Sequence, residues 1–229
     1  MLKLWRINKT MKTIKENMPF ITALLFVLGV AGLGFILFRT APPATGQSAG
    51  TASNDMSGHH GGSAPVASNN GPLNSLVGQI LPTITLQDKD GKTYTNADLK
   101  GKYTVLFFNE GLMCYPGCWN QIAAFGSDSR YNSADVQAIS VVVDSATDWQ
   151  KAIAKMPKLA DARTMFDSGA SASKQLGMLT TTSSMHKGSL PGHTYVLVDK
   201  EGIVRYVYDD PNMAIANDSL FKKIQELSK

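Results

Sequence analysis

Three things are scarce in this 229-residue sequence: net charge in its larger part, repeated segments and cysteine. Residues 40–229 carry sixteen basic and seventeen acidic side chains and are nearly neutral, so the positive net charge of +4 is due to residues 1–39, with six basic and one acidic. No basic patch and no RNA- or DNA-binding motif appears, so we expect no nucleic-acid partner. No segment is repeated, and residues 73–229 have the length of one domain with its own core.

The two cysteines, Cys114 and Cys118, lie between an apolar segment and a helix-like one. If the chain turns into a helix near Pro116, residues four apart share one face, within reach of a disulfide. A structural staple or two inert buried thiols is one interpretation, but so short a loop contributes only about 2 kcal/mol through chain entropy. A strand-to-helix loop with exposed amides lowers a thiol pKa, which favours a functional pair.

The segment 19–38, PFITALLFVLGVAGLGFILF, contains no charge and is long enough to cross a hydrocarbon core of about 30 Å. A cleaved signal peptide is the alternative, but its apolar part would be unusually long and no clean small-x-small site follows. Five basic residues precede the segment, and after Arg39 none appears until Lys89. We therefore expect a single-pass anchor in the cytoplasmic membrane that contacts lipid, with residues 1–18 inside and the rest extracytoplasmic.

Residues 39–72 are rich in Ala, Gly, Ser, Pro and Asn and have scarcely any bulky apolar side chain. Such a composition cannot bury enough surface to order itself, so we expect a flexible linker. Within it the run DMSGHHGG brings Met56, His59 and His60 close together. These residues suit a soft or borderline metal such as copper, whereas the alternative is a solvated linker with incidental histidines.

Residues 73–229 alternate between strand-like and helix-like segments. Asp90 and Gly91 give a hairpin signal, and Gly177 closes a short helix. The expected strands are 105–108, 136–143, 163–166, 194–198 and 203–208, and the expected helices are 96–100, 119–129, 147–156, 171–176 and 217–227. This order indicates an α/β domain with a mixed central sheet flanked by helices. Functional groups gather at the carboxyl ends of strands in such sheets, and the cysteine loop leaves one of them.

Several segments of residues 76–228 together carry a family resemblance: GQILPTITLQDKDGK, LKGKYTVLFFN, the cysteine loop, SVVVD, FDSGASASKQLGM and HTYVLVDKEGIVRYVY. In this order they resemble the thioredoxin-fold redoxins of the alkyl hydroperoxide reductase and thiol-specific antioxidant (AhpC/TSA) family, which includes the peroxiredoxins. The resemblance implies a thioredoxin-like fold and a thiol-based oxidoreductase that needs no bound cofactor.

The family's threonine-proline-glycine-cysteine pattern reads Tyr115, Pro116, Gly117, Cys118 in this sequence. The resemblance thus implies that Cys118 is the peroxidatic residue and that Cys114 resolves the oxidised form. Tyr115 replaces the threonine whose hydroxyl supports peroxide. A phenol also donates a hydrogen bond but is bulkier, which puts efficient peroxidase activity in question.

His193 begins the strand-like segment HTYVLVD, where many peroxiredoxins carry an arginine and where thioredoxin-like proteins carry a proline; here Pro191 lies two residues too early. A histidine there would lower a thiol pKa, act as general base or bind metal. The alternative is an ordinary strand-start histidine bonded to backbone. Glu110 either takes protons near the thiols or is a solvated loop carboxylate.

Four further residues are weaker candidates. We expect Trp119 to pack against or shield a sulfur and Asp144 to cap the helix near residue 147. Arg163 is a candidate for the family arginine that steadies the thiolate, although its register does not place it. His186 is a candidate ligand within an exposed loop.

The set Cys114, Cys118 and His193 is also similar to the metal site of the Sco-type copper proteins, which share the fold and the N-terminal anchor. Two functions therefore stay open. The first is a membrane-anchored thiol oxidoreductase that acts on a small peroxide or a protein disulfide and draws on an external electron donor. The second is copper binding or delivery by these three residues. A non-catalytic scaffold is the third possibility.

Overall fold

The computed structural model describes residues 70–229. The expected anchor at 19–38, almost all of the expected linker and the Met56, His59 and His60 group lie outside the described residues. In residues 70–229, no helix combines the length and the apolar character that a membrane crossing requires. These observations leave the membrane anchor a prediction.

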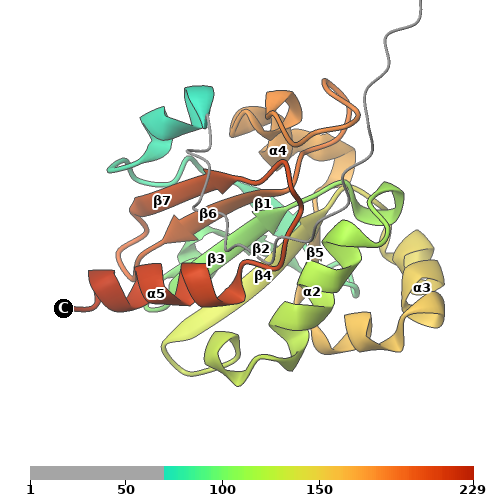
Figure 1. Ribbon diagram of the computed structural model, residues 1–229, viewed down its shortest axis with the longest axis horizontal. Coiled ribbons are helices and arrows are strands. Elements are labelled where there is room, and N and C mark those ends of the chain that lie inside the picture. Colours follow the sequence, from blue (N-terminus) through green and yellow to red (C-terminus); the bar gives the residue numbers. More distant parts are fainter. Residues whose placement is uncertain (1–69) are drawn as a thin grey trace, which may run out of the picture. The chain divides into compact units, whose positions relative to one another are not determined.

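A seven-stranded mixed sheet forms the centre of the domain (Figure 1), in the order β2-β1-β5-β4-β3-β6-β7. The strands are β1 (Thr85–Gln87), β2 (Thr93–Thr95), β3 (Tyr103–Phe108), β4 (Val136–Val142), β5 (Thr164–Phe166), β6 (Thr194–Val198) and β7 (Val204–Asp209). Strands β3, β4 and β5 run parallel to one another, whereas β6 pairs antiparallel with β3. The expected hairpin at Asp90–Gly91 is confirmed, because β1 and β2 pair antiparallel around it.

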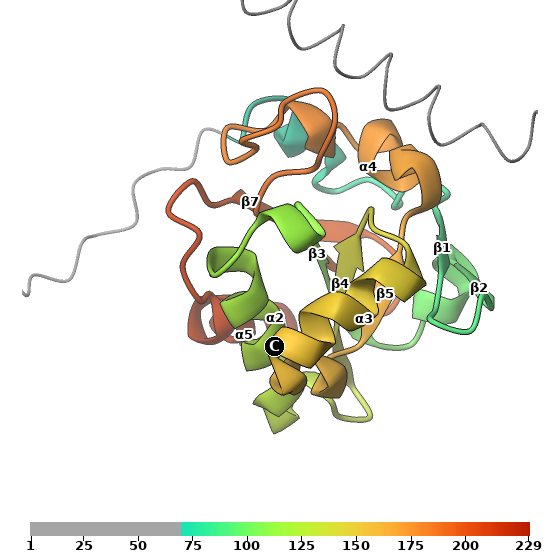
Figure 2. The ribbon, with the colours of Figure 1, turned by 90° about the vertical axis from the view of Figure 1, so that its right-hand side faces the viewer.

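Helices cover both faces of this sheet. The α-helices are α2 (Gly117–Ser127), α3 (Ala146–Lys155), α4 (Ser171–Gln175) and α5 (Asn217–Leu227). Short 3-10 helices are η1 (Gly71–Leu76), η2 (Asn96–Leu99), η3 (Gly111–Met113), η4 (Ser129–Tyr131), η5 (Pro157–Asp161), η6 (Ser168–Ala170) and η7 (Met178–Thr180). Helices α2, α3 and α5 pack on one face, here called the α2 face, and α4 with η1 packs on the other, the α4 face. Figure 2 shows the three longer helices grouped on one side.

The two faces are separated by strict alternation along the strands. In β3, Val105 and Phe107 point to the α2 face, whereas Leu106 and Phe108 point to the α4 face. All four side chains are fully buried. The continuous apolar run in the sequence is therefore explained by a central strand covered on both sides.

Two expectations about local structure need correction. Helix α2 begins at Gly117, two residues earlier than the pattern indicated, so Cys118 belongs to its first turn. Asp144 does not cap α3: the Ser145 hydroxyl accepts from the backbone N–H of Asp148. The Asp144 carboxylate instead accepts from the backbone N–H of Leu112, at 3.0 Å, and burial raises its pKa. Asp144 therefore holds the loop that leads into the cysteines.

Two glycines allow close approaches that position the cysteine loop. Gly111 has φ of +57°, and a Cβ there would lie 1.7 Å from a carboxylate oxygen of Asp144. Gly126, near the end of α2, would place a Cβ 2.7 Å from the backbone nitrogen of Ala162. Any side chain at either position would displace backbone or the half-buried Asp144, so both ends of the loop and helix are fixed by contact.

Residues at the start of the described chain pack against β7. The Asn70 side chain donates to the carbonyl of Val207 and accepts from the backbone N–H of Asp209. Leu73, in η1, is buried in the core of the α4 face. The folded part of the chain thus includes residues 70–72, which the composition alone had placed with the linker.

Candidate active site

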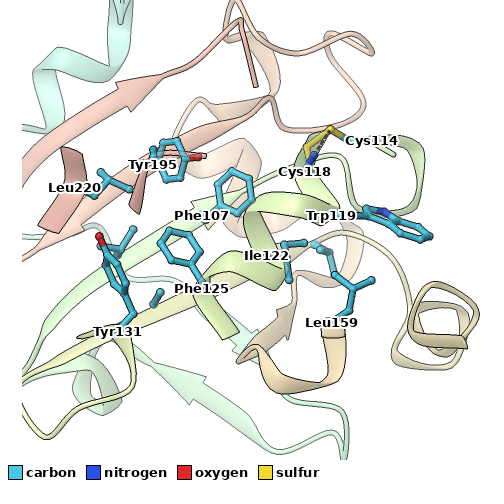
Figure 3. Close-up of a cluster of buried hydrophobic side chains, with 14 of the residues drawn as sticks. Phe107, Cys114, Cys118, Trp119, Ile122, Phe125, Tyr131, Leu159, Tyr195 and Leu220 are labelled. Atoms are coloured by element: carbon cyan, nitrogen blue, oxygen red, sulfur yellow. Dashed lines mark hydrogen bonds between the residues drawn. A yellow bond between two sulfur atoms is a disulfide. The ribbon is translucent and has the colours of Figure 1, made fainter. Parts of the chain in front are cut away.

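Cys114 and Cys118 are joined in a disulfide, with 2.03 Å between the sulfurs and 5.4 Å between the Cα atoms. Cys114 follows η3, just beyond the carboxyl end of β3, and Cys118 lies in the first turn of α2. Figure 3 shows the bond at the start of α2, beside Phe107 and Trp119. The disulfide reach expected from the spacing of four is confirmed.

Both sulfurs are buried, whereas the sequence suggested an exposed loop. Cys118 is 0 % exposed and Cys114 is 2 % exposed. Trp119 is buried beside them, and its indole N–H donates to the carbonyl of Gly111 at 3.0 Å. This contact agrees with the expected packing role of Trp119. Water and substrates therefore reach the disulfide only if a covering group moves.

Met213 is one such covering group, and sequence analysis did not identify it. Its sulfur lies 3.7 Å from Cys114 Sγ, and its backbone has φ of +51°, which is unusual for a side chain of this size. The carboxylate of Asp210 accepts from the backbone N–H groups of Asn212 and Ala214 and so fixes this turn. Gly117 leaves room for it, since a Cβ there would lie 3.2 Å from Met213 Cβ.

His193 stands directly before β6 and reaches the same disulfide. Its Nδ1 lies 3.4 Å from Cys118 Sγ and its Nε2 lies 2.7 Å from the hydroxyl of Tyr195. The ring is fully buried, and this burial lowers the pKa of His193 to about 4. The imidazole beside the disulfide is therefore neutral near pH 7. Its contact with a sulfur is what the functional interpretation of the sequence expected.

Three more buried side chains extend this contact and were missed by sequence analysis. Tyr195 donates to Gln121 Oε1 at 3.0 Å, and Gln121 Nε2 donates to Asn217 Oδ1 at 2.8 Å. One signal was available: Tyr195 is two residues after His193 in a strand and Gln121 is three after Cys118 in a helix, so each shares a face with its neighbour. Asn217 gave no comparable signal because it comes from a distant helix.

Glu110 belongs to a different cluster. It is 1 % exposed, which corrects the picture of a solvated loop carboxylate. Its Oε1 accepts from the backbone N–H groups of Met185 and His186, at 2.6 Å and 3.1 Å, and its Oε2 lies 2.9 Å from His186 Nδ1. Glu110 and His186 thus pin the 184–186 segment to the cysteine loop, and His186 does not join the group of possible metal ligands around the sulfurs.

Two further candidates remain: Tyr115 is largely exposed, and Arg163 contacts another part of the sheet. Tyr115 is 66 % exposed, and its ring packs edge-on against Trp119 with 5.0 Å between centroids. The Arg163 guanidinium donates to Gln137 and lies over the ring of Tyr94, so it contacts the β1–β2 side of the sheet. Arg163 therefore does not fill the place of the family arginine.

The arrangement supports two kinds of chemistry. A disulfide whose sulfur touches a neutral imidazole is a redox pair with a base next to it. The ligand atoms of Cys114, Cys118 and His193 also lie within 4.8 Å of one another, the distances that a single soft metal ion needs when the thiols are reduced.

Comparison with known proteins places these residues in a family. Residues 77–207 match the model described as the AhpC/TSA family. The chain is 34 % identical over 134 residues to "Peroxiredoxin Q, chloroplastic" of Triticum aestivum, which is 58 % of each chain. It is 30 % identical over 149 residues to the protein of the same name from Sedum lineare, covering 65 % of this chain and 76 % of that one.

Solved structures resemble the fold at lower identity. AhpC of Enterococcus faecalis matches with a TM-score of 0.56 at 16 % identity, covering 67 % of this chain and 92 % of that one. A peroxiredoxin-like protein from Aquifex aeolicus matches with a TM-score of 0.55 at 20 % identity, covering 66 % and 86 %. These matches confirm the expected thioredoxin-like α/β fold. The chain spans 58 % and 60 % of two of the curated relatives that it matches.

Proposed function

We propose that this chain, which belongs to the AhpC/TSA family, reduces a peroxide by cycling Cys114 and Cys118 between dithiol and disulfide. The observation that carries the proposal is the bond between its only two cysteines, made beside a buried neutral histidine. Membership of a family of thiol-dependent oxidoreductases supports it. A protein disulfide is the second substrate class that the same pair would serve.

In the proposed cycle, the Cys118 thiolate attacks one peroxide oxygen, a sulfur–oxygen bond forms and the oxygen–oxygen bond breaks. The leaving alkoxide or hydroxide takes up a proton and departs as alcohol or water. Cys114 then attacks the sulfur of the Cys118 sulfenic acid, which forms the disulfide and releases water. An external dithiol supplies the two electrons and two protons that restore the thiols.

Two features support Cys118 as the attacking sulfur. It lies in the first turn of α2, where the helix dipole stabilises a thiolate, and it contacts His193, whereas Cys114 contacts Met213. Tyr115 stands where the family has threonine, but its ring lies largely in solvent. We propose that Tyr115 shapes the entrance and that Glu110 orders the neighbouring loop.

Rapid mixing of the reduced full-length chain with hydrogen peroxide and with an organic hydroperoxide tests this function. Trp119, next to Cys118, is a natural fluorescence probe. Cys118→Ser should abolish the fast phase, and Cys114→Ser should keep it and accumulate a sulfenic acid that mass spectrometry detects after trapping. A wild-type rate constant no greater than that of Cys118→Ser, with both peroxides, would reject peroxide reduction; turnover of a disulfide substrate would then support thiol exchange.

We also propose that residues 19–38 anchor the chain in the cytoplasmic membrane, with the redoxin domain on the extracytoplasmic side. The uncharged segment and the basic residues before it support this topology. A membrane-impermeant thiol reagent added to intact cells should label the reduced cysteines. Labelling that appears only after lysis would overturn the proposed orientation.

Copper binding is the second candidate function, favoured by the clustering of three ligand atoms and by the Met213 thioether beside Cys114. Reduced Cys114 and Cys118 with His193 would offer thiolate and imidazole to Cu(I), and Met213 would add a soft thioether. Titration of the reduced chain with Cu(I) tests this. Stoichiometric binding that is lost in His193→Ala favours it, and failure of the reduced wild type to bind removes it.

A further inference from the structure

Behind His193, three buried side chains continue a line of hydrogen bonds that begins at Cys118. Cys118 Sγ lies 3.4 Å from His193 Nδ1, and His193 Nε2 lies 2.7 Å from the Tyr195 hydroxyl. From there the line runs to Gln121 Oε1, and Gln121 Nε2 continues it to Asn217. The polar atoms of these groups are buried, so each donor among them needs an acceptor and each acceptor needs a donor.

At the far end of the line the direction of each hydrogen bond is fixed, because the partner groups there can only donate or only accept. The backbone N–H of Ala216 donates to the Gln121 side chain at 2.7 Å, so the accepting atom is the oxygen. Asn217 Nδ2 donates to the carbonyl of Ala124 at 3.1 Å and to the carboxylate of Asp128 at 2.9 Å. The Ala124 carbonyl oxygen cannot donate, and the Asp128 carboxylate cannot donate when it is ionised. The pKa of Asp128 is lowered to about 2, chiefly by Arg130. Both amides are therefore oriented unambiguously.

The orientation of the Gln121 amide also decides which hydrogen bonds the Tyr195 hydroxyl donates and accepts. Its hydroxyl oxygen lies 3.0 Å from Gln121 Oε1 and 3.5 Å from the Ala214 carbonyl oxygen, and both of these only accept. The phenol proton must point to one of them, so the hydroxyl oxygen accepts from His193 Nε2. The neutral ring carries one proton, which leaves a lone pair on Nδ1, facing Cys118.

We propose that Tyr195, Gln121 and Asn217 are positioning residues that hold His193 in the Nε2-protonated tautomer, so that Nδ1 accepts the proton of the Cys118 thiol. This inference rests on the proposed function and specifies how its nucleophile is activated. In the reduced protein, proton transfer leaves a thiolate on Cys118 beside an imidazolium whose Nε2–H stays bonded to Tyr195, and the adjacent thiolate offsets the burial that keeps His193 neutral beside the disulfide. After the peroxide bond breaks, Nδ1 returns that proton to the leaving alkoxide, which departs as alcohol.

The other tautomer is disfavoured by the same geometry. A proton on Nδ1 would point at the sulfur and leave no base for the thiol. The Tyr195 hydroxyl would then have to donate to Nε2, which leaves its own lone pairs against Gln121 Oε1. Since His193, Tyr195 and Gln121 are all fully buried, bulk water cannot relieve that mismatch.

Nitrogen NMR of the reduced full-length chain measures the tautomer directly. The four histidines are labelled with nitrogen-15, and the His193 signals are those missing from His193→Gln. The expected spectrum has a protonated Nε2 and an Nδ1 with a free lone pair. A protonated Nδ1 in the wild type would overturn the proposal; His193→Gln serves only to assign the signals, and the tautomer is read in the wild type.

Tyr195→Phe removes only the phenol oxygen. We expect a mixture of His193 tautomers and an approximately tenfold slower alkylation of Cys118 by iodoacetamide, followed by mass spectrometry. Gln121→Leu, which removes the acceptor of the phenol proton, should act in the same direction. Tyr206→Phe is the matched control: it removes a phenol oxygen from neighbouring β7 and should leave the tautomer and the alkylation rate unchanged.

Outcomes of the two proposals are distinguishable. A wild type with the expected tautomer and fast Cys118 alkylation, but no reaction with any peroxide, supports the positioning role and rejects peroxide as the substrate. A wild type that reduces peroxide while Tyr195→Phe and Gln121→Leu keep both its tautomer and its alkylation rate overturns the positioning role and leaves the proposed function intact.

Discussion

The domain contains two buried polar clusters that contact different kinds of group. One is centred on Asp209, and the other is the hydrogen-bonded line through Tyr195. Asp209 on β7 accepts from the backbone N–H groups of Thr182 and Ser183, at 2.8 Å and 3.1 Å, and from the hydroxyls of Ser183 and Thr194. The line through Tyr195 instead consists of neutral side chains and ends at a sulfur. The Asp209 cluster satisfies the polar groups of a loop, whereas the neutral one leads to Cys118, the proposed nucleophile.

The difference teaches how to tell a structural from a functional polar group in a core. A buried carboxylate whose partners are backbone amides is fully satisfied by the fold and stabilises it. The contact between His193 and Cys118 contributes nothing comparable to stability, because thiol hydrogen bonds are weak. Asp209 should therefore affect folding, and the His193 line should affect reactivity.

The largest expected effect is on the sulfur itself. Cys118→Ser should lower the rate of peroxide reduction by roughly a thousandfold or more, because it removes the nucleophile. The free energy of unfolding of the reduced protein should change far less, since serine fills nearly the same space. Single-turnover kinetics and urea unfolding, measured on one preparation, check both. Comparable losses in activity and stability would contradict the division between the two clusters.

Asp209→Ala is the matching change in the charged cluster. It leaves the backbone N–H groups of Thr182 and Ser183, of which the second is buried, and two buried hydroxyls without this acceptor, so we expect a loss of about 3 kcal/mol or more in the free energy of unfolding. In the molecules that remain folded, the rate constant for the reaction of Cys118 with peroxide should stay within about twofold of wild type, which allows for small packing shifts. A tenfold slower reaction at unchanged stability would show that the cluster acts on the site.

The stability of the disulfide form should fall as the pH drops from about 6.5 towards 4. The pKa of His193 in the folded protein is about 4, below its usual value of 6.5, so in this window the unfolded chain binds a proton that the folded chain does not. At 1.36 kcal/mol per pH unit the loss reaches at most about 3 kcal/mol. Urea unfolding at several pH values measures it.

His193→Gln provides the control for that pH dependence, because glutamine does not titrate. The variant should lose this part of the slope, whereas His186→Gln should keep it, since His193 is unchanged there. An identical slope in the wild type and in His193→Gln would assign the acid sensitivity to carboxylates instead.

The smallest expected effect belongs to Tyr115. Its ring is largely exposed, so Tyr115→Phe should change the free energy of unfolding by less than about 0.5 kcal/mol. We expect the peroxide rate constant to change by less than about threefold, in contrast to Tyr195→Phe on the buried line. A loss of a hundredfold would show that this phenol supports peroxide in place of the family threonine.

Much of the fold was predictable because it depends on patterns among residues that are close in the sequence. The apolar run of β3, the hairpin at Asp90–Gly91 and the helix closed by Gly177 each depend on neighbours in sequence. The cysteine pair followed from helix geometry, and His193 from its register in the family resemblance. The order of the strands in the sheet and the 3-10 helices gave no such local signal.

The rest of the site could not be predicted because it is assembled from distant segments. Met213 contacts Cys114 across 99 residues, and Asn217 contacts Gln121 across 96. A glutamine in a helix pattern predicts solvent exposure, yet Gln121 is buried because Tyr195, Ala216 and Asn217 satisfy its amide. Only the three-dimensional structure shows which polar side chains have such partners.

Gly126 limits the movements that the proposed redox cycle could involve. Because the last turn of α2 touches the backbone at Ala162, with no room for even a methyl group, the helix body cannot slide along the sheet. We therefore expect any exposure of the sulfurs after reduction to involve the first turn near Gly117 and the Met213 turn. The two ends of this short helix therefore differ: the far end is held by a close backbone contact, and the near end carries Cys118 beneath the Met213 side chain.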